Sequence, residues 1–293
     1  MKLKNINCVI VNYNDGDRVI KLIGQIRGYS CFDQIVVVDN ASTDDSWQRL
    51  KALQDQKVAV IRGEKNGGYG YGNNLGVTYA ARVNNATHAV IANPDVEFSQ
   101  KTVLSMARMF DSHPDAGVVS AVMEDMEYGG LGYGWRLHGF TGELLSMGPV
   151  SRRLFSRFLN YPTSYFQGKR AAWVDVVHGS MLMVDTGAFL ECGGYDEKIF
   201  LYQEEAVLAW RMRTSGFRTI LVLTESYLHS HGASITKSLS SQTERQKLRH
   251  DSAMYYMKHY LYINPVQELI ARLWFGVILL EIRAAGILLP RKG

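Results

Sequence analysis

The sequence is poor in cysteine and proline, and this excludes several classes of protein. Its 293 residues hold only three cysteines, Cys8, Cys31 and Cys192, whose number and spacing fit neither a disulfide framework nor a cysteine-rich metal site. We therefore expect reduced, buried thiols and a cytoplasmic location. Six prolines and 46% hydrophobic residues are typical of an ordinary globular chain rather than a collagen-like or disordered one.

Long hydrophobic runs are absent as well. The N-terminus lacks the apolar stretch and small-residue cleavage site of a secretory signal, so we do not expect secretion. The longest apolar run covers the eight residues 273–280, between Arg272 and Glu281. A membrane-spanning helix needs about 20 such residues, so none is expected.

Neither sign of charge dominates, because 32 Lys and Arg face 28 Asp and Glu, for a net charge of +4. The small excess is unevenly placed: nine basic and four acidic residues lie from Lys237 onward, which leaves 23 and 24 in the first 236 residues. A basic C-terminal segment suits an anionic partner such as a phosphate or a membrane surface. No nucleic-acid-binding motif accompanies it, so nucleic acid is not expected as a partner.

The first hundred residues do contain alternating strand and helix signals. Apolar runs predict strands at 6–11, 34–38, 58–61 and 88–92. Helical spacing predicts helices at 17–28, from a cap at Ser42 or Thr43 to Leu53, and from the end of the Gly/Asn-rich stretch 63–76 to Val83. This alternation indicates βαβ units with a mainly parallel sheet, and ligands bind such sheets beyond the carboxyl ends of the strands.

Polar residues gather after the predicted strands. Asn12 and Asn14 follow the first, Asp39 follows the second, and Asn93 and Asp95 follow the fourth. Each could serve only as a turn residue, but their repetition at one edge of a sheet predicts a binding site. The phosphate-binding pattern GxxxxGK[ST] is absent, and no GxGxxG opens a helix directly after the first strand.

The segments VIVNYN, VVVDNASTDDS, KNGGYGYGNNLG and IANPDV, in this order, resemble the nucleotide-sugar half of the inverting family 2 glycosyltransferases. Further on, HGSMLMV and GGYDEKIFLYQEE resemble their acceptor half, and the resemblance spans roughly residues 5–260. It implies a GT-A fold, which is an α/β fold of the Rossmann-like nucleotide-diphospho-sugar transferase type. We expect a catalytic domain at 1–236, with a nucleotide-sugar half at 1–98 and an acceptor half at 99–236, and a basic helical extension at 237–293.

The resemblance also implies roles for single residues. In the family pattern Asp39 contacts the nucleobase or ribose, Asp95 holds Mg²⁺ or Mn²⁺ on the diphosphate, and Glu205 is the general base with Glu204 beside it. A histidine in LHSHGAS touches the metal or the diphosphate. Only one of the two histidines in this motif is expected to face the site, and we favour His231 over His229. The other residues expected to contact the donor or acceptor are Asn12, Asn14, Asn66, Gly68, Asn74, Asn93, Gly179 and Arg211.

Two positions depart from the family pattern. Relatives carry Glu-Asp-x-Asp where this chain has Glu204-Glu205-Ala206-Val207, so the base is one methylene longer and the second Asp is missing. Asn93 stands where many relatives have the first Asp of a DxD motif. An alternative interpretation is that the acidic pair only opens a helix, whose positive N-terminal end favours carboxylates.

Residues 265–290 predict a helix rich in Leu, Ile and Ala. Two interpretations are open. The helix packs on the catalytic domain or in a homodimer, or it lies in the membrane interface as a peripheral anchor on the inner face of the cytoplasmic membrane. The aromatic and basic segment 152–170 fits a mobile acceptor loop, a membrane-facing patch or an ordinary exposed loop.

The resemblance therefore implies an enzyme that moves a sugar, with inversion, from a nucleoside diphosphate donor to a glycan or lipid-linked glycan acceptor. Because Asn93-Pro94-Asp95-Val96 is the variant of the bacterial rhamnosyltransferase branch, the resemblance favours dTDP-rhamnose as donor and a surface polysaccharide as product. Two alternatives stay open. A sugar nucleotidyltransferase would carry a Gly-rich, Arg-containing loop where this chain has NYNDGDR. A degenerate scaffold would bind sugar nucleotides without catalysis.

Overall fold

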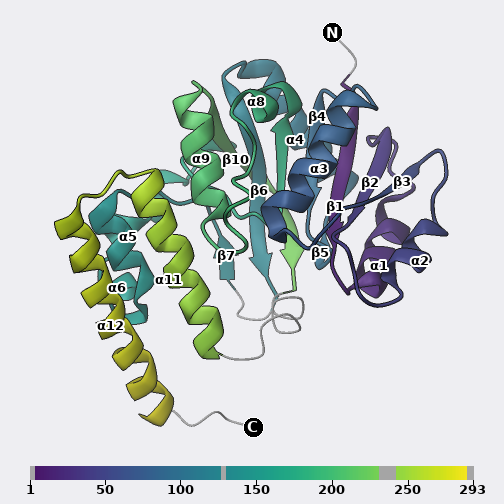
Figure 1. The fold of residues 1–293 in the computed structure, drawn as a ribbon. Coiled ribbons are helices and arrows are strands. Elements are labelled where there is room, and N and C mark those ends of the chain that lie inside the picture. The colour runs from purple at the N-terminus through teal and green to yellow at the C-terminus, as the bar shows by residue number, and fades with distance from the viewer. Residues whose placement is uncertain (1–3, 127–129, 231–241, 289–293) are drawn as a thin grey trace.

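A mixed β-sheet forms the centre of the protein. The computed structural model describes residues 4–126, 130–230 and 242–288, and Figure 1 shows their arrangement. The ten strands run in the order β3-β2-β1-β4-β9-β6-β10-β5, with β7 beside β6 and β8 beside β10. Their bounds are β1 Ile6–Asn12, β2 Gln34–Asp39, β3 Val58–Arg62, β4 His88–Ala92, β5 Val96–Glu97, β6 Ala116–Asp125, β7 Gly130–Gly132, β8 Ala171–Val174, β9 Met181–Asp185 and β10 Arg218–His229.

The four strands predicted from apolar runs are confirmed as β1 to β4, each within one residue of its predicted bounds. They are parallel neighbours, and their register pairs Asn12 with Asp39 and Asp39 with Arg62. β9 pairs antiparallel with both β4 and β6, and β10 runs parallel to β6. The carboxyl ends of β1 to β4, β6 and β10 therefore lie at one edge of the sheet.

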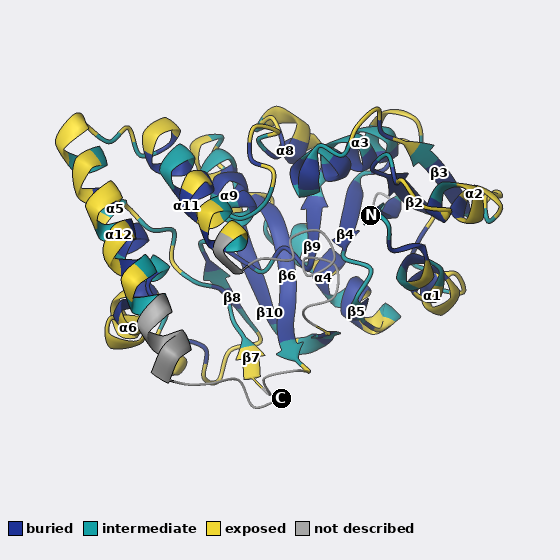
Figure 2. Cartoon of the chain, turned by 60° about the horizontal axis from the view of Figure 1, so that its bottom comes forward, coloured by how far each residue is buried: buried dark blue, intermediate teal, exposed yellow. Residues whose placement is uncertain are grey.

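Helices cover both faces of the sheet. Alternate strand residues point to opposite layers: Ile10 and Val37 pack with α1, α2 and α4, whereas Val9 and Val38 pack with α3, α8 and α9. Figure 2 shows the strands buried between these layers. The helices of the two layers are α1 Gly16–Ile26, α2 Ser46–Lys51, α3 Gly68–Arg82, α4 Gln100–Ser112, α8 Thr186–Glu191 and α9 Glu204–Thr214.

The Gly/Asn-rich stretch is not a loop up to Gly76 as the sequence predicts, because α3 already begins at Gly68. Close packing explains why glycine is helical here. A Cβ on Gly72 would lie 2.6 Å from Val11 Cγ1, and one on Gly76 would lie 2.3 Å from Val9 Cγ1. The helix thus approaches β1 more closely than a larger residue allows, and this contact overrides the weak helix propensity of glycine.

The predicted cap of the second helix is also wrong. α2 starts after Asp45, without a side-chain cap, and ends at Lys51. The Ser42 hydroxyl instead accepts hydrogen bonds from Asn12 Nδ2 (2.9 Å) and the Asn14 amide (3.0 Å). Ser42 therefore joins the loop after β2 to the end of β1 and to the loop that follows β1, rather than opening a helix.

A second group of helices lies beside the sheet and has its own core. Leu144, Met257, Phe275 and Ile278 pack together there, from α5, α11 and α12. Figure 1 shows α6 on the same side of the molecule. Because α6 and α7 cover residues 149–154 and 156–159, the segment 152–170 begins with short helices rather than one long loop. The elements of this group are α5 Phe140–Met147, α6 Pro149–Leu154, α7 Ser156–Leu159, α11 Gln242–His259 and α12 Pro265–Leu288. The 3₁₀ turn η1 Thr163–Tyr165 follows α7 and packs on the sheet through Tyr165.

Two further expectations concern membrane-spanning helices and the cysteines. Within the described ranges, no helix is both long and apolar enough to cross a membrane. The three cysteines form no disulfide, and Cys8 is buried as predicted, but Cys31 and Cys192 are only half-buried.

Candidate active site

A buried polar cluster closes the carboxyl ends of β1 and β2. Asn12 Nδ2 donates to Asp39 Oδ1 (2.8 Å), and the Ser42 amide donates to Asp39 Oδ2 (3.1 Å). Arg62 Nε lies 3.5 Å from the same Oδ2 atom, although half of the Arg62 side chain is exposed. Asp39 itself is fully buried. It therefore fixes the two loops that border the expected nucleotide site.

Asn14 lies next to this cluster in a left-handed conformation, with φ at 52°. Its Oδ1 accepts from the Thr43 amide at 2.8 Å, and its Nδ2 donates to Thr43 Oγ1 at 3.0 Å. Asparagine tolerates this backbone conformation better than most residues, because its short side chain bonds locally. Asn14 thus joins the loops after β1 and β2 at the surface.

The start of α3 meets the segment that precedes the acidic pair. Gly68 has φ at +86°, and a Cβ there would lie 2.2 Å from the Phe200 carbonyl oxygen. The Tyr69 amide donates to that oxygen at 3.3 Å. Asn66 Oδ1 accepts from the Gly68 amide (3.2 Å), and Asn40 Nδ2 donates to the Gly68 carbonyl (2.8 Å). Only glycine fits this conformation and this close approach.

The Asn-Pro-Asp segment lies between β4 and the end of β10. The Asn93 amide donates to the Ser180 carbonyl at 2.8 Å, and Asp95 Oδ1 lies 3.3 Å from His229 Nε2. That Oδ1 atom is buried and makes no hydrogen bond within the described part of the chain. A buried carboxylate oxygen without a hydrogen bond is the donor that a hard cation takes, so Asp95 fits Mg²⁺ or Mn²⁺.

The histidine favoured by the sequence, His231, lies outside the described residues. His229, two residues earlier, contacts Asp95. The signal was present in the sequence, since the motif LHSH contains His229 as well as His231. Among the described residues, no group of three or more His, Cys, Asp or Glu side chains could hold a metal by itself. A cation at Asp95 would therefore depend on oxygens of the diphosphate.

The acidic pair opens α9 in a low-polarity environment. Glu204 is buried and Glu205 is half-buried. Burial, and then the charge of Glu205, hold the pKa of Glu204 well above its ordinary value. Burial also raises the pKa of Glu205. Both carboxyls therefore bind a proton more tightly than exposed glutamates do.

Gly179 places one of these carboxyls. Its amide donates to Glu205 Oε1 at 3.3 Å, and a Cβ at this position would lie 2.8 Å from the same oxygen. Its carbonyl accepts from Tyr69 Oη at 2.5 Å. Since Ser180 contacts Asn93, the residues around Gly179 connect the acidic pair, the start of α3 and the Asn-Pro-Asp segment.

Asn74 and Arg211 have their polar groups engaged within the chain. Asn74 accepts from the Tyr195 amide (2.9 Å) and donates to the Tyr195 carbonyl (3.0 Å). Arg211 Nη1 donates to the carbonyls of Gly193 (2.8 Å) and Gly194 (3.0 Å). Both residues therefore hold the Gly-Gly-Tyr-Asp-Glu loop between α3 and α9.

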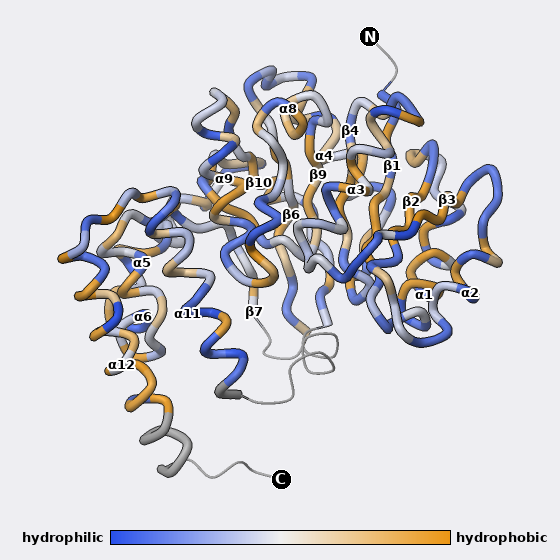
Figure 3. The backbone as a smooth tube through the Cα atoms, viewed as in Figure 1, coloured by the Kyte–Doolittle hydropathy of each residue, from blue (hydrophilic) through white to orange (hydrophobic). Residues whose placement is uncertain are grey.

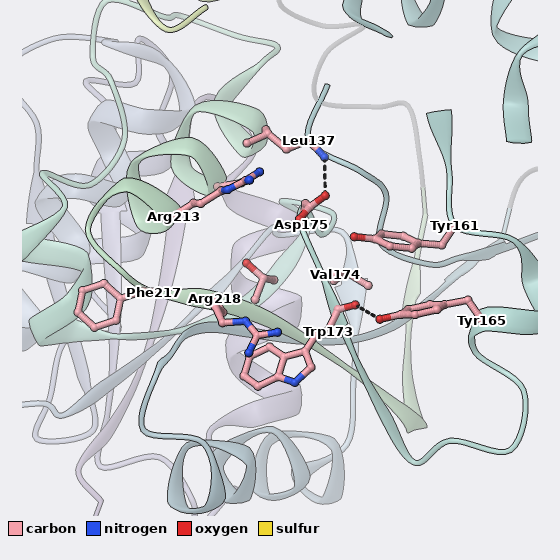
Figure 4. Close-up of a pocket in the computed structure, with 11 residues that line it drawn as sticks. Leu137, Tyr161, Tyr165, Trp173, Val174, Asp175, Arg213, Phe217 and Arg218 are labelled. Atoms are coloured by element: carbon pink, nitrogen blue, oxygen red, sulfur yellow. Dashed lines mark hydrogen bonds between the residues drawn. The ribbon is translucent and has the colours of Figure 1, made fainter. Parts of the chain in front are cut away.

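A cavity of about 360 Å³ lies away from these residues, beside the first residues of β10 (Figure 4). Asp175 Oδ2 accepts there from the Leu137 amide at 3.0 Å. Two aromatic rings that line the cavity contact basic side chains: Arg218 lies 3.6 Å from the centre of the Trp173 ring, and Lys169 lies 3.7 Å from the centre of the Tyr165 ring. Because β10 starts at the opposite edge of the sheet, this cavity is not part of the site at the carboxyl ends.

Solved structures share this fold. The chain matches S. aureus TarS (1-349) in complex with UDP-GlcNAc with a TM-score of 0.59 at 14% identity, over 94% of this chain and 71% of that one. It matches the mannosyltransferase PcManGT from Pyrobaculum calidifontis, in complex with GDP-Man and Mn²⁺, with a TM-score of 0.54 at 14% identity, over 96% of this chain and 76% of that one. These likenesses confirm the GT-A fold.

Two sequence relatives are glycosyltransferases by name. The low-salt glycan biosynthesis hexosyltransferase Agl10 of Haloferax volcanii is 24% identical over 72% of this chain and 62% of its own length. The N-acetylglucosaminyl-diphospho-decaprenol L-rhamnosyltransferase of Mycobacterium tuberculosis is 24% identical over 67% of this chain and 66% of its own length. This chain thus spans slightly less than two thirds of either relative. The family model described as Glycosyl transferase family 2 matches residues 8–185, more than half of the chain. The protein therefore belongs to glycosyl transferase family 2.

Proposed function

We propose that the protein transfers a sugar, with inversion, from a nucleoside diphosphate donor to a hydroxyl of a glycan acceptor. The observation that carries this proposal is the pair Glu204 and Glu205, whose raised pKa values suit a general base and whose contact with Gly179 joins it to the Asn-Pro-Asp segment. An inverting transfer needs a base on the acceptor and a positive group on the departing diphosphate. The acidic pair can supply the base, and the Asn-Pro-Asp segment can hold a cation against the diphosphate.

We assign the base to Glu205. The Gly179 amide orients Oε1, and Oε2 is the atom to which we assign the acceptor hydroxyl. The hydroxyl oxygen then attacks the anomeric carbon while its proton passes to Glu205, and the bond to the diphosphate breaks on the opposite face. The charge of Glu205 raises the pKa of Glu204, because two carboxylates close together resist double ionisation, so we assign the resident proton of the pair to Glu204 and leave Glu205 free to act as the base.

On the donor side we propose that Asp95 holds Mg²⁺ or Mn²⁺, supported by its buried Oδ1 atom. Two structures of similar fold carry Mn²⁺. When bound, such an ion neutralises the charge that develops on the leaving diphosphate. His229 lies beside the Asp95 carboxylate, while Asn12, Asp39 and Asn14 shape the wall that receives the nucleotide.

For the donor we propose dTDP-rhamnose and, for the product, a surface polysaccharide. The sequence Asn93-Pro94-Asp95-Val96 and the similarity to the mycobacterial L-rhamnosyltransferase support this choice. The similarity to a hexosyltransferase keeps other hexoses as competitors.

We propose a lipid-linked acceptor, reached by peripheral contact with the inner face of the cytoplasmic membrane. One face of α12 exposes the side chains of Val266, Leu269, Ile270, Leu273, Val277 and Leu280. Figure 3 shows this helix as a hydrophobic element at the margin of the molecule. Beside it, Arg152, Arg153 and Arg157 are exposed on α6 and α7 and suit anionic headgroups. The name of the mycobacterial relative also specifies a decaprenol diphosphate.

The proposed function is tested by a donor panel. Thermal shift and release of nucleoside diphosphate are measured with dTDP-rhamnose, UDP-GlcNAc and GDP-mannose, each with Mn²⁺ and with EDTA. We expect stabilisation by one donor that needs Mn²⁺ and is lost in Asp95→Asn, whereas the surface control Asp115→Asn behaves as the parent. Stabilisation without turnover by any donor would favour a degenerate scaffold. No stabilisation by any nucleotide sugar would overturn the proposal.

A further inference from the structure

The two residues in front of the acidic pair have an unusual backbone. Tyr202 and Gln203 both lie in the left-handed region, with φ at 70° and 71°. Neither is glycine, so each loses stability in this conformation. Consecutive residues stay there only where surrounding contacts determine their geometry, and such segments gather at functional sites. Contacts from other parts of the chain are therefore needed to keep Tyr202 and Gln203 in this conformation at the start of α9.

Gln203 is held by a carboxylate from another part of the chain. Its Nε2 donates to Oε1 of Glu143, which belongs to α5. Glu143 is only 3% exposed, and burial raises its pKa from 4.5 to about 7. The other groups that face this carboxyl are His138, whose Nδ1 lies 4.0 Å from Oε2, and Tyr256 of α11. A neutral glutamine would fill the same space with less loss of solvation, so stability alone does not favour a carboxylate here.

Helix α11 holds the same turn from a second direction. The Arg249 guanidinium lies 4.6 Å from the Tyr202 ring centre, and Ser252 Oγ donates to the Leu201 carbonyl at 2.7 Å. Ile199 and Val207 also share a buried cluster with Tyr256 and Tyr260. The segment from Ile199 to Val207 thus packs against the group of helices that includes α5 and α11.

We propose that Glu143 is a positioning residue, which fixes Gln203 in its left-handed conformation and thereby sets the direction of Glu204 and Glu205. This inference rests on the proposed function, because it assumes that the acidic pair carries the base. Glu143 touches neither reactant. It acts through one hydrogen bond at the residue where α9 begins, and a base displaced by about 1 Å can lose 10²-fold in rate.

The test compares four variants. Glu143→Leu keeps the volume but removes the acceptor, and Glu143→Gln keeps a neutral acceptor. Gln203→Asn favours the left-handed backbone but is too short to reach Glu143. Glu281→Leu is the matched control, because Glu281 Oε1 accepts from the Val150 amide and joins α12 to α6 without touching the turn.

We expect Glu143→Leu and Gln203→Asn to lower kcat about 10- to 100-fold, with the KM for the donor unchanged within about twofold. Glu143→Gln should retain kcat within about fivefold, and Glu281→Leu should match the parent. Equal kcat in Glu143→Leu and the parent would overturn the proposal. So would an equal loss in Glu281→Leu, because the effect would then be general loosening of the helices.

Hydrogen exchange gives a readout that does not need turnover. Amides of residues 199–207 should exchange at least about tenfold faster in Glu143→Leu than in the parent or Glu281→Leu, while those of β1 and β4 stay unchanged. Unchanged exchange at 199–207 would overturn the positioning role. If the parent transfers no sugar, the proposed function fails, but the exchange contrast still decides whether Glu143 holds the turn.

Discussion

Glu205 is the proposed base, and this assignment can be tested at a single residue. Glu205→Gln preserves shape but cannot accept a proton, so kcat should fall by about 10²–10⁴ while donor affinity stays unchanged. Glu205→Asp should keep substantial activity if the backbone tolerates the shorter reach. Initial rates and donor binding are measured for both variants.

Glu204→Gln is the comparison for this prediction. We expect it to lower the rate less than Glu205→Gln, since Glu204 is not the group assigned to accept the proton of the acceptor hydroxyl. The reverse order would move the base to Glu204. If neither variant lowers the rate, the acidic pair has no role in catalysis and serves only to start α9.

At the scale of one element, the start of α3 depends on glycine for a reason that can be measured. Gly68→Ala would place a Cβ 2.2 Å from the Phe200 carbonyl oxygen at φ +86°. We expect it to lower the free energy of unfolding by more than about 1 kcal/mol, the usual cost of a left-handed alanine. Urea unfolding gives this value.

The matched control for Gly68→Ala is Gly24→Ala. Gly24 lies inside α1 at ordinary helical geometry, with nothing within 4 Å of a built Cβ. This change should raise stability by about 0.5–1 kcal/mol, because alanine is the better helix former. Equal effects of the two substitutions would contradict the close contact between α3 and Phe200.

The two interpretations of the C-terminal helix turn out to be compatible. Ala271, Phe275 and Ile278 of α12 are buried against α5 and α11, while another face exposes Leu269, Leu273 and Val277. Deletion of the whole helix would therefore open a core. A surface variant separates packing from membrane contact, because it changes only the exposed face.

The triple variant Leu269→Gln, Leu273→Gln, Val277→Gln should bind anionic vesicles at least about tenfold more weakly, since each apolar side chain contributes roughly 1.5–3 kcal/mol when fully buried. Vesicle flotation at low and high salt measures this. Leu104→Gln, at an exposed position of α4, serves as the control. If the triple variant instead turns a dimer into a monomer and vesicle binding is unchanged, the exposed face is a homodimer contact.

For the whole molecule, buried carboxyls couple stability to pH. The pKa of Glu143 is raised from 4.5 to about 7, so its native-state stabilisation is complete below pH 4.5 and is lost as pH rises through 7. The pKa of Glu204 and that of Glu205 are raised by burial in the same direction. Burial lowers the pKa of His88 to about 4, so this residue has the opposite effect and loses stability as pH falls below 6.5.

The variant Glu143→Gln isolates one of these groups. Its free energy of unfolding minus that of the parent should increase between pH 4.5 and 7, by about 1.4 kcal/mol for each unit of pKa difference, and then level off. Denaturant unfolding at several pH values measures this difference. A difference that does not change with pH would show that Glu143 titrates alike in the folded and unfolded chain.

Much of the nucleotide half is predictable because its signals are local. The strands that become β1 to β4 are short apolar runs, and Asp39 and Asp95 follow strand ends directly. The helical start at Gly68 was missed because glycine is a weak helix former, and only the approach to Val9 and Val11 selects it. Local sequence predicts a helix cap at Ser42, but its hydroxyl bonds to Asn12, which lies 30 residues earlier and outside any local pattern.

The sequence by itself determined the family, the parallel strands and the residue types at the carboxyl edge, since these depend on periodicity and on short motifs. Only the tertiary structure decided which side chains meet. His229 at the end of β10 reaches Asp95, and a carboxylate in α5 contacts the turn before Glu204 across 60 residues of chain. Such contacts depend on how helices and strands pack, and burial then changes the proton affinity of the groups enclosed. No local pattern in the sequence contains that information.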